Sequence, residues 1–135
     1  MPAFLVKTEP STYAFADLQR DKRTTWDGVS NPVALRNIGA IRKGDTVVVY
    51  HTGDEKQAVG LATAASDAYP DPKLGDPKRV VIDLKPDRAL PKPVTLAQVK
   101  ADAVLKGTEL ARLPRLSVIP FSEEHFARLM KLAGA

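Results

Sequence analysis

A central strand is predicted by Thr46-Val47-Val48-Val49-Tyr50-His51, a run of β-branched and aromatic residues that follows a Gly44-Asp45 turn. The run is apolar almost throughout instead of alternating, so both faces of the strand are expected to be covered. A sheet built around such a strand needs helices or further strands packed against it. The flanking sequence must therefore supply these elements.

The segment before this strand predicts a helix that begins at Asn31-Pro32. Asparagine is a favoured N-cap, and proline fits the first helical position because its missing N–H is not needed there. Apolar residues then recur at helical spacing and would bury one face of the helix: Ala34, Leu35, Ile38 and Ile41.

Further elements are predicted on both sides. Strands are expected at residues 3–7, 58–66, 79–85 and 115–119, and helices from Ser11 or Thr12 to about 21, at 95–100 and from Ser122 to about 133. Gly60 indicates a bulge or a close backbone approach, residues 69–78 a loop, and Pro91 and Pro93 a break before Thr95. Without regular βαβ alternation, these elements predict an α+β fold, a mixed sheet or small barrel of about five or six strands flanked by helices.

Composition restricts the class of protein. The 135 residues, 44% of them hydrophobic, are enough for one domain spanning 1–135. The net charge of +4 is compatible with a polyanionic partner and is also common among soluble proteins. No apolar run is long enough to cross a membrane, no signal peptide is recognised at the start, and cysteine is absent. We therefore expect a cytoplasmic monomer that does not bind membranes.

The residues of standard catalytic sites are missing. The sequence has neither a glycine-rich phosphate loop nor a nucleophile elbow, and His51 and His125 lie far apart, outside any zinc-ligand spacing. No metal and no cofactor are expected. Asp27 and Glu9 are the carboxylates that could form an acid/base pair, but nothing else in the sequence supports catalysis.

Two short segments carry the signal for a ligand: Lys7-Thr8-Glu9-Pro10 and Thr25-Trp26-Asp27-Gly28-Val29-Ser30-Asn31. An aromatic face beside groups that accept hydrogen bonds suits a flat ligand such as a nucleobase. Each residue has a structural alternative. Trp26 also fits a core, Asn31 a helix cap, Asp27 an Asx turn before Gly28, and His51 a buried strand end.

Six segments, in order, resemble the EVE domain, a family of the PUA-like superfamily: Leu5–Pro10, Thr25–Asn31, Tyr50-His51, Val59–Ala62, Ala68–Asp71 and Arg115–Pro120. The resemblance implies a β-barrel-like sheet with peripheral helices and a pocket on one side. It implies kinship with YTH and ASCH domains, and an association with modified bases, notably 5-methylcytosine and its oxidised forms in DNA. The chain departs from the family at Pro32, often an aromatic or histidine, and at Leu35, often a basic residue.

By analogy with YTH domains, the resemblance implies that Lys7-Thr8-Glu9 contacts the base and that Trp26 forms a wall of the pocket. A carboxylate such as Glu9 accepts a hydrogen bond from the exocyclic amine of cytosine, which favours a cytosine-type base. The predicted base-binding residues are Trp26, Glu9, Asp27, Asn31, Lys7, Thr8, Tyr50, His51 and Ser117. The predicted phosphate contacts are Arg115, Arg36, Arg42 and Lys43.

These observations predict a non-enzymatic module that recognises a modified cytosine, in DNA more than in RNA. Two alternatives stay open at this stage. The same fold can bind a modified base in tRNA, or the chain can bind a free nucleobase or nucleotide, as a sensor or as an enzyme that uses Asp27 or Glu9. Basic side chains clustered around Trp26 would favour a nucleic acid, whereas an uncharged rim would favour a small molecule.

Overall fold

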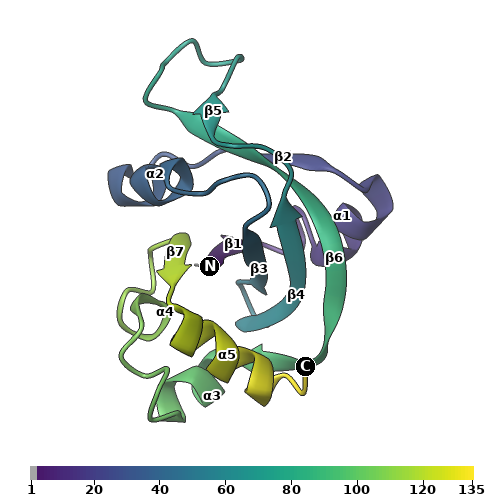
Figure 1. The fold of residues 1–135 in the computed structure, drawn as a ribbon, viewed down its shortest axis with the longest axis vertical. Coiled ribbons are helices and arrows are strands. Elements are labelled where there is room, and N and C mark those ends of the chain that lie inside the picture. Colours follow the sequence, from purple (N-terminus) through teal and green to yellow (C-terminus); the bar gives the residue numbers. More distant parts are fainter. Residues whose placement is uncertain (1–2) are drawn as a thin grey trace.

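The structure, a computed structural model, describes residues 3–135, and Met1 and Pro2 of the predicted domain lie outside this range. The described chain forms seven strands and five helices (Figure 1). The strands are β1 (Ala3–Thr8), β2 (Thr24–Trp26), β3 (Thr46–His51), β4 (Gln57–Ala64), β5 (Tyr69–Pro70), β6 (Val80–Thr95) and β7 (Val118–Phe121). The helices are α1 (Phe15–Asp21), α2 (Pro32–Gly39), α3 (Leu96–Ala101), α4 (Glu109–Arg112) and α5 (Glu123–Leu132).

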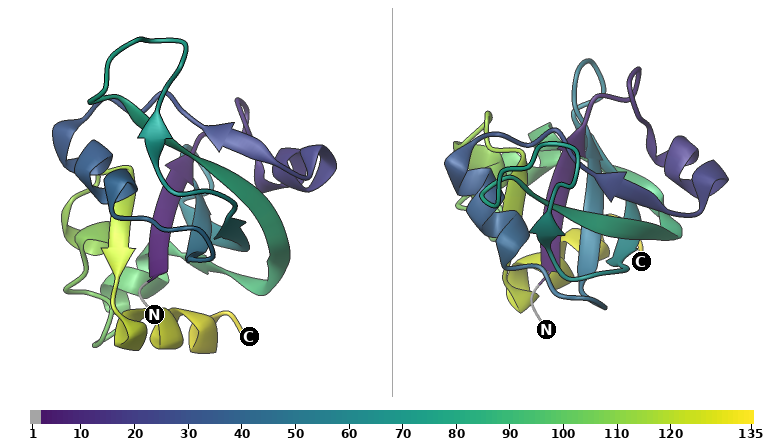
Figure 2. Two further views of the ribbon diagram at one scale, coloured as in Figure 1. Left: turned by 45° about the horizontal axis from the view of Figure 1, so that its top comes forward. Right: turned by 90° about the horizontal axis from the view of Figure 1, so that it is seen from above.

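The strands form one mixed sheet in the order β2-β6-β4-β3-β1-β7, with β5 added to β6. β1 and β3 run parallel, and every other pair in this sheet is antiparallel. The long strand β6 curves around the others, while α1 and α2 lie on different sides of β2 (Figure 2). The predicted α+β fold, a mixed sheet or small barrel flanked by helices, is therefore confirmed, and the structure adds that the sheet is curled. No helix in residues 3–135 is long and apolar enough to cross a membrane.

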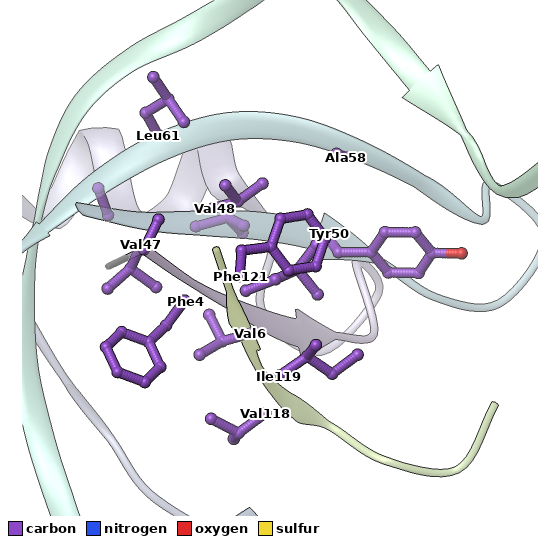
Figure 3. Packing of buried hydrophobic residues seen from close by; sticks show 14 of the residues in the cluster. Phe4, Val6, Val47, Val48, Tyr50, Ala58, Leu61, Val118, Ile119 and Phe121 are labelled. Carbon is purple, nitrogen blue, oxygen red and sulfur yellow. The ribbon is translucent and has the colours of Figure 1, made fainter. Parts of the chain in front are cut away.

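The core surrounds β3, as the sequence predicts. Residues 47–51 of this strand are all buried. Phe4 and Leu5 of β1 lie opposite Val47 and Val48 of β3, so that successive pairs of buried side chains point to opposite faces of the sheet. Figure 3 shows Phe4 beside Val47, and the hydroxyl of Tyr50 points away from this cluster. The strand thus has apolar neighbours on both faces, which accounts for its unbroken apolar sequence.

Three predicted helix starts are confirmed by their caps. Asn31 Oδ1 accepts hydrogen bonds from the backbone N–H groups of Val33 (2.9 Å) and Ala34 (3.1 Å) at the start of α2. The Thr95 hydroxyl caps α3, and the Ser122 hydroxyl caps α5. Each cap gives an otherwise unpaired N–H group an acceptor, so these boundaries were readable from local sequence alone.

The first helix begins later than predicted, because Ala14 and not Ser11 or Thr12 is its N-cap. The Asp17 carboxylate accepts from the Ala14 N–H at 2.8 Å. The buried imidazole of His51 accepts from the Phe15 N–H at 3.0 Å through Nε2. The His51 imidazole, from a strand distant in sequence, thus replaces a capping hydroxyl as the acceptor. Nothing in the local sequence indicates this contact.

The predicted break at Pro91 and Pro93 is wrong, because β6 continues through both prolines to Thr95. The register between β4 and β6 explains how the strand tolerates them. Ala89 lies opposite Gly60 and Val94 opposite Ala58, so the residues between them bulge out of the ladder. Proline lacks an N–H group and is accommodated in such a bulge. β7 also differs from prediction, starting at Val118 and not at residue 115.

The close approach predicted at Gly60 is confirmed. A Cβ atom at this position would lie 2.5 Å from Cζ of Phe15, whose ring packs directly on the β4 backbone. Phe15 is the first residue of α1 and is buried. The absence of a side chain at Gly60 therefore lets α1 sit against the sheet.

We expect the substitution Gly60→Ala to lower the free energy of unfolding by about 1–3 kcal/mol, the usual cost of forcing extra volume into a packed core. Urea unfolding followed by circular dichroism measures this loss. The matched control is Gly39→Ala at the end of α2, where an added Cβ meets nothing within 4 Å. Equal midpoints for the two variants would contradict the proposed packing of Phe15.

Candidate functional site

A cavity of about 520 Å³ opens beside the ends of β1 and β2. Its walls come from four places in the chain: the end of β1, the loop before α1, the run from β2 to the start of α2, and the residue before β7. The lining residues are Lys7, Thr8, Thr12, Tyr13, residues 24–31 and Ser117. The two segments singled out by the sequence thus meet at one site.

Two aromatic rings form a corner of this cavity. The centroids of Tyr13 and Trp26 lie 6.2 Å apart with an interplanar angle of 82°, an edge-to-face contact. Trp26 is 8% exposed, so it belongs to the core and to the cavity wall at once. The Thr8 hydroxyl donates to the Tyr13 carbonyl at 2.7 Å and fixes the loop that carries Tyr13.

Burial raises the pKa of the Tyr13 phenol above its usual value, and the phenol donates its hydrogen bond to Asp21 at 2.9 Å. The ring is therefore held from both ends, by Thr8 through the backbone and by Asp21 through the hydroxyl. A fixed aromatic ring offers a flat ligand a surface that does not need to reorganise on binding.

Two charged residues line the cavity, Lys7 and Asp27. Lys7 Nζ donates to the Pro114 carbonyl at 3.1 Å and lies 5.6 Å from the centre of the Tyr50 ring. Burial holds the pKa of Lys7 below its usual range. The exposed Asp27 carboxylate accepts no hydrogen bond from any residue of the described chain, so the Asx turn considered for it is absent. The turn itself comes from Gly28, with φ of 78°.

Asn31 caps α2 and also lines the cavity. Both capping bonds go to Oδ1, and Nδ2 donates no hydrogen bond within residues 3–135. The cap thus uses the amide oxygen and leaves the N–H₂ group of this cavity-lining residue free. The cap and the pocket interpretations of Asn31 are thus compatible.

β2 is anchored by Asp83, which lies opposite Thr25 in the ladder with β6. Its carboxylate accepts from Tyr69 (2.6 Å), from Arg23 (2.8 Å) and from the Thr25 hydroxyl (3.1 Å). Burial raises the pKa of Asp83, but these hydrogen bonds outweigh it and hold the pKa below its usual value of 3.8. Asp83 therefore holds the short strand that ends in Trp26.

Six of the nine predicted base-binding residues line the cavity: Trp26, Asp27, Asn31, Lys7, Thr8 and Ser117. The other three do not. The Glu9 carboxylate turns away and accepts from the Ser11 N–H and hydroxyl at 3.2 and 3.1 Å, while packing on Gly53. Tyr50 is buried in the core.

His51 bonds within the fold through both ring nitrogens. Because Nε2 accepts from Phe15, Nδ1 carries the proton that is donated to Glu55 at 2.9 Å. That hydrogen bond lowers the pKa of Glu55. His51 is therefore a buried group at a strand end, the structural alternative to a base contact that the sequence offered.

The predicted phosphate contacts separate into two groups. Arg115 lies in a hollow that adjoins the cavity, and Arg36 lies exposed on α2. Arg42 and Lys43 follow the C-terminal end of α2, where their backbone N–H groups donate to Asp45 and Asp67. Since Asn31 marks the opposite end of this eight-residue helix, they stand roughly 12 Å or more along its axis from the cavity.

Two cavity features escape the sequence interpretation. Tyr13 lies in an irregular loop without a periodic sequence pattern. The one sequence signal for its position is that it follows closely after Thr8 in the chain. Arg79 belongs to a surface basic pair, yet its Nε donates to the carbonyl of Val29 at 3.2 Å and holds the β2–α2 loop. Neither role has a local sequence signal.

Comparison with known proteins gives consistent matches along the chain. A model of the EVE domain family matches residues 3–132. Thymocyte nuclear protein 1 of Rattus norvegicus is 28% identical over 166 residues, which cover 98% of this chain and 74% of that protein. This relative is named as a nuclear protein, so the cytoplasmic location expected for this chain stays a prediction. The expected monomeric state also stays a prediction.

Two solved structures are closely similar. Rpa0253 from Rhodopseudomonas palustris, solved by NMR, superposes with a TM-score of 0.94 at 37% identity, covering 99% of this chain and 94% of that one. The human THYN1 protein in complex with 5-methylcytosine-containing DNA superposes with a TM-score of 0.90 at 26% identity, covering 100% and 99%.

A curled mixed sheet with peripheral helices and a cavity on one side defines a PUA-like protein. Within that class, the chain belongs to the EVE domain family.

We expect the stability contributed by Asp83 to depend on pH. The folded pKa lies below the unfolded one, so this contribution is present above about pH 4 and is lost as the pH falls through the folded value. Wild type should therefore exceed Asp83→Asn in stability most at neutral pH, and this advantage should shrink in acid. Urea unfolding followed by Trp26 fluorescence at several pH values measures it.

The control for this experiment is Asp54→Asn, at an exposed turn between β3 and β4. Its difference from wild type should stay small at every pH. If the difference between wild type and Asp83→Asn were the same in acid as at neutral pH, the carboxylate would not anchor β2 in its ionised form.

Proposed function

We propose that this EVE domain reads modified nucleobases, and that it takes a cytosine with a 5-methyl or oxidised substituent from DNA into the cavity at Tyr13 and Trp26. The observation that carries the proposal is the aromatic corner, set beside a carboxylate without a hydrogen-bond partner in the described chain. The human relative in complex with 5-methylcytosine-containing DNA supports the choice of ligand.

The polar groups around the corner suit the edge of cytosine. The Asp27 carboxylate is an acceptor for the exocyclic amine, and Asn31 Nδ2 is a donor for a ring acceptor. Asp27 thus takes the role that the sequence suggested for Glu9. The principle is unchanged, because a carboxylate still reads the amine, but a different residue carries it.

The expected affinity is modest. Stacking contributes about 1–3 kcal/mol per base, and a good base-edge contact adds about 1–3 kcal/mol of discrimination. Extruding a base from a duplex costs a few kcal/mol, so these contributions nearly cancel. Phosphate contacts must supply the net affinity, which will fall with salt and favour single-stranded or mismatched substrates.

The positions of the cations favour a nucleic acid over a free nucleobase. Lys7 lines the cavity, Arg79 bonds to the lining residue Val29, and Arg115 lies in the adjoining hollow. Lys7 in the cavity and Arg115 in the adjoining hollow match a phosphate chain, with Arg79 bonded to a lining residue as a third cation nearby. The binding experiment below compares DNA with RNA oligonucleotides directly.

Fluorescence titration tests the proposal directly, because Trp26 is the only tryptophan. Single-stranded oligonucleotides with one 5-methylcytosine or 5-hydroxymethylcytosine should change its emission and bind more tightly than unmodified ones. Matched RNA oligonucleotides serve as the second series. An equal response to every oligonucleotide, or none, would falsify the reader function. A preference for RNA would show that the ligand is a modified base in RNA and not in DNA.

Trp26→Ala should weaken binding by about 1–3 kcal/mol, the value of base stacking. Since Trp26 is also part of the core, Trp26→Phe is measured beside it and should keep the fold and part of the affinity. Anisotropy of a labelled oligonucleotide replaces the tryptophan signal in both variants. Undiminished binding by a folded Trp26→Ala protein would remove the stacking role.

The two carboxylates can be compared as a matched pair. Asp27→Asn should reduce the preference for cytosine-type bases by about 1–3 kcal/mol. A carboxylate only accepts hydrogen bonds, whereas an amide also donates them and therefore matches the cytosine amine less well. Glu9→Gln should leave that preference unchanged, since the Glu9 carboxylate is bonded to Ser11 outside the cavity. Competition among cytosine-, adenine- and thymine-centred oligonucleotides measures the preference. The reverse result would return the role to Glu9.

A further inference from the structure

A second hollow, of about 360 Å³, adjoins the cavity. Its walls come from the start of α2 and from the segment between α4 and β7. Nearby, the Asn37 side chain of α2 donates a hydrogen bond to the carbonyl of Val118 in β7 at 2.8 Å and joins these two elements. Four apolar residues line it, together with two polar ones: Val33, Leu113, Pro114, Leu116, Asn31 and Arg115.

The apolar lining of this hollow is unusually exposed. Val33 is 40% exposed and Leu113 is 46% exposed, and only one other large hydrophobic residue of the described chain, Leu74, is comparably open to solvent. Leu74 lies elsewhere, in the loop between β5 and β6. Two exposed apolar side chains that share one concave site indicate a binding surface more than chance exposure.

The hollow and the cavity share a boundary that carries polar groups, called the ridge below. Asn31 lines both, and Lys7, which lines the cavity, donates its ammonium hydrogen bond to Pro114, which lines the hollow. Arg115 adds a second cation on the side of the hollow. Two concave sites, each with apolar walls, thus flank a ridge that carries positive charge.

This arrangement matches the chemistry of two consecutive nucleotides, in which flat bases alternate with an anionic phosphate. We propose that the hollow lined by Val33 and Leu113 is a subsite for the base of the nucleotide next to the modified one. The phosphate between the two nucleotides then meets Lys7 and Arg115 at the ridge. This inference rests on the proposed function and assigns it a second contact along the strand.

A protein partner fits the hollow less well. A protein interface of standard size covers about 800 Å² on each side, whereas the apolar surface here is confined to four residues around one small hollow. The cations at the ridge also favour a phosphate chain over an apolar peptide face.

The test uses single-stranded oligonucleotides with one 5-methylcytosine and an abasic site placed next to it, on the 5′ or the 3′ side. For wild type, the abasic site on one side should weaken binding about fivefold, as expected for losing the burial of a base against aliphatic side chains. Leu113→Ala should bind the intact oligonucleotide about fivefold more weakly and should not respond further to that abasic site.

Leu74→Ala is the matched control, because it removes an equally exposed leucine outside the site. It should bind like wild type. Val33→Ala tests the opposite wall and should behave like Leu113→Ala, and thermal unfolding checks that each variant is folded. Arg115→Gln should reduce the slope of log affinity against log salt by about 1, the change expected when one phosphate contact is lost.

Two results would overturn the subsite: wild-type affinity that ignores abasic sites on both sides, or a Leu113→Ala protein that stays as sensitive to them as wild type. Failure of the proposed function looks different. In that case wild type would bind methylated and unmethylated oligonucleotides equally, while the effects of Leu113 and of the abasic neighbour would still support or refute the subsite. Absence of binding to any oligonucleotide would contradict both.

Discussion

The parallel pairing of β1 with β3 is the constraint on which the rest of the structure depends. Parallel neighbours cannot be joined by a hairpin, so the chain must leave the end of β1 at Thr8 and return to the start of β3 at Thr46. Residues 9–45 make this crossing and contain α1, β2 and α2. They also carry Tyr13 and most of the cavity wall. The candidate site is therefore a product of the topology.

The parts of the fold that local chemistry decides were predictable from sequence. The apolar run of β3 is buried, and Asn31, Thr95 and Ser122 each cap the helix that follows. These features need only a few neighbouring residues, since a cap or an apolar strand carries its own signal. The position of the cavity was predictable in the same way, because Trp26 and its polar neighbours form one short segment of sequence and line it together.

The parts that depend on distant partners were not predictable in this way. Pro91 and Pro93 read as a break because only the register with β4 reveals the bulge that accommodates them. Glu9 and Asp27 are both carboxylates beside a strand end, and only the turn at Ser11 shows which of them bonds within the fold. Tyr13 enters the site because Thr8 holds its loop. In each case the deciding atom lies outside the local sequence.

The order of pairing in the sheet bears on how the chain matures during synthesis. β1 pairs on one side with β7, so that Ala3 lies opposite Phe121, and the backbone N–H of Lys7 donates to the carbonyl of Ser117. On the ribosome, β1 emerges long before these partners and keeps an open, apolar edge until they arrive. Such an edge is prone to pair with other chains. Ser117, one of these late residues, also lines the cavity, so a nascent chain completes the cavity wall only when its sheet edge becomes protected.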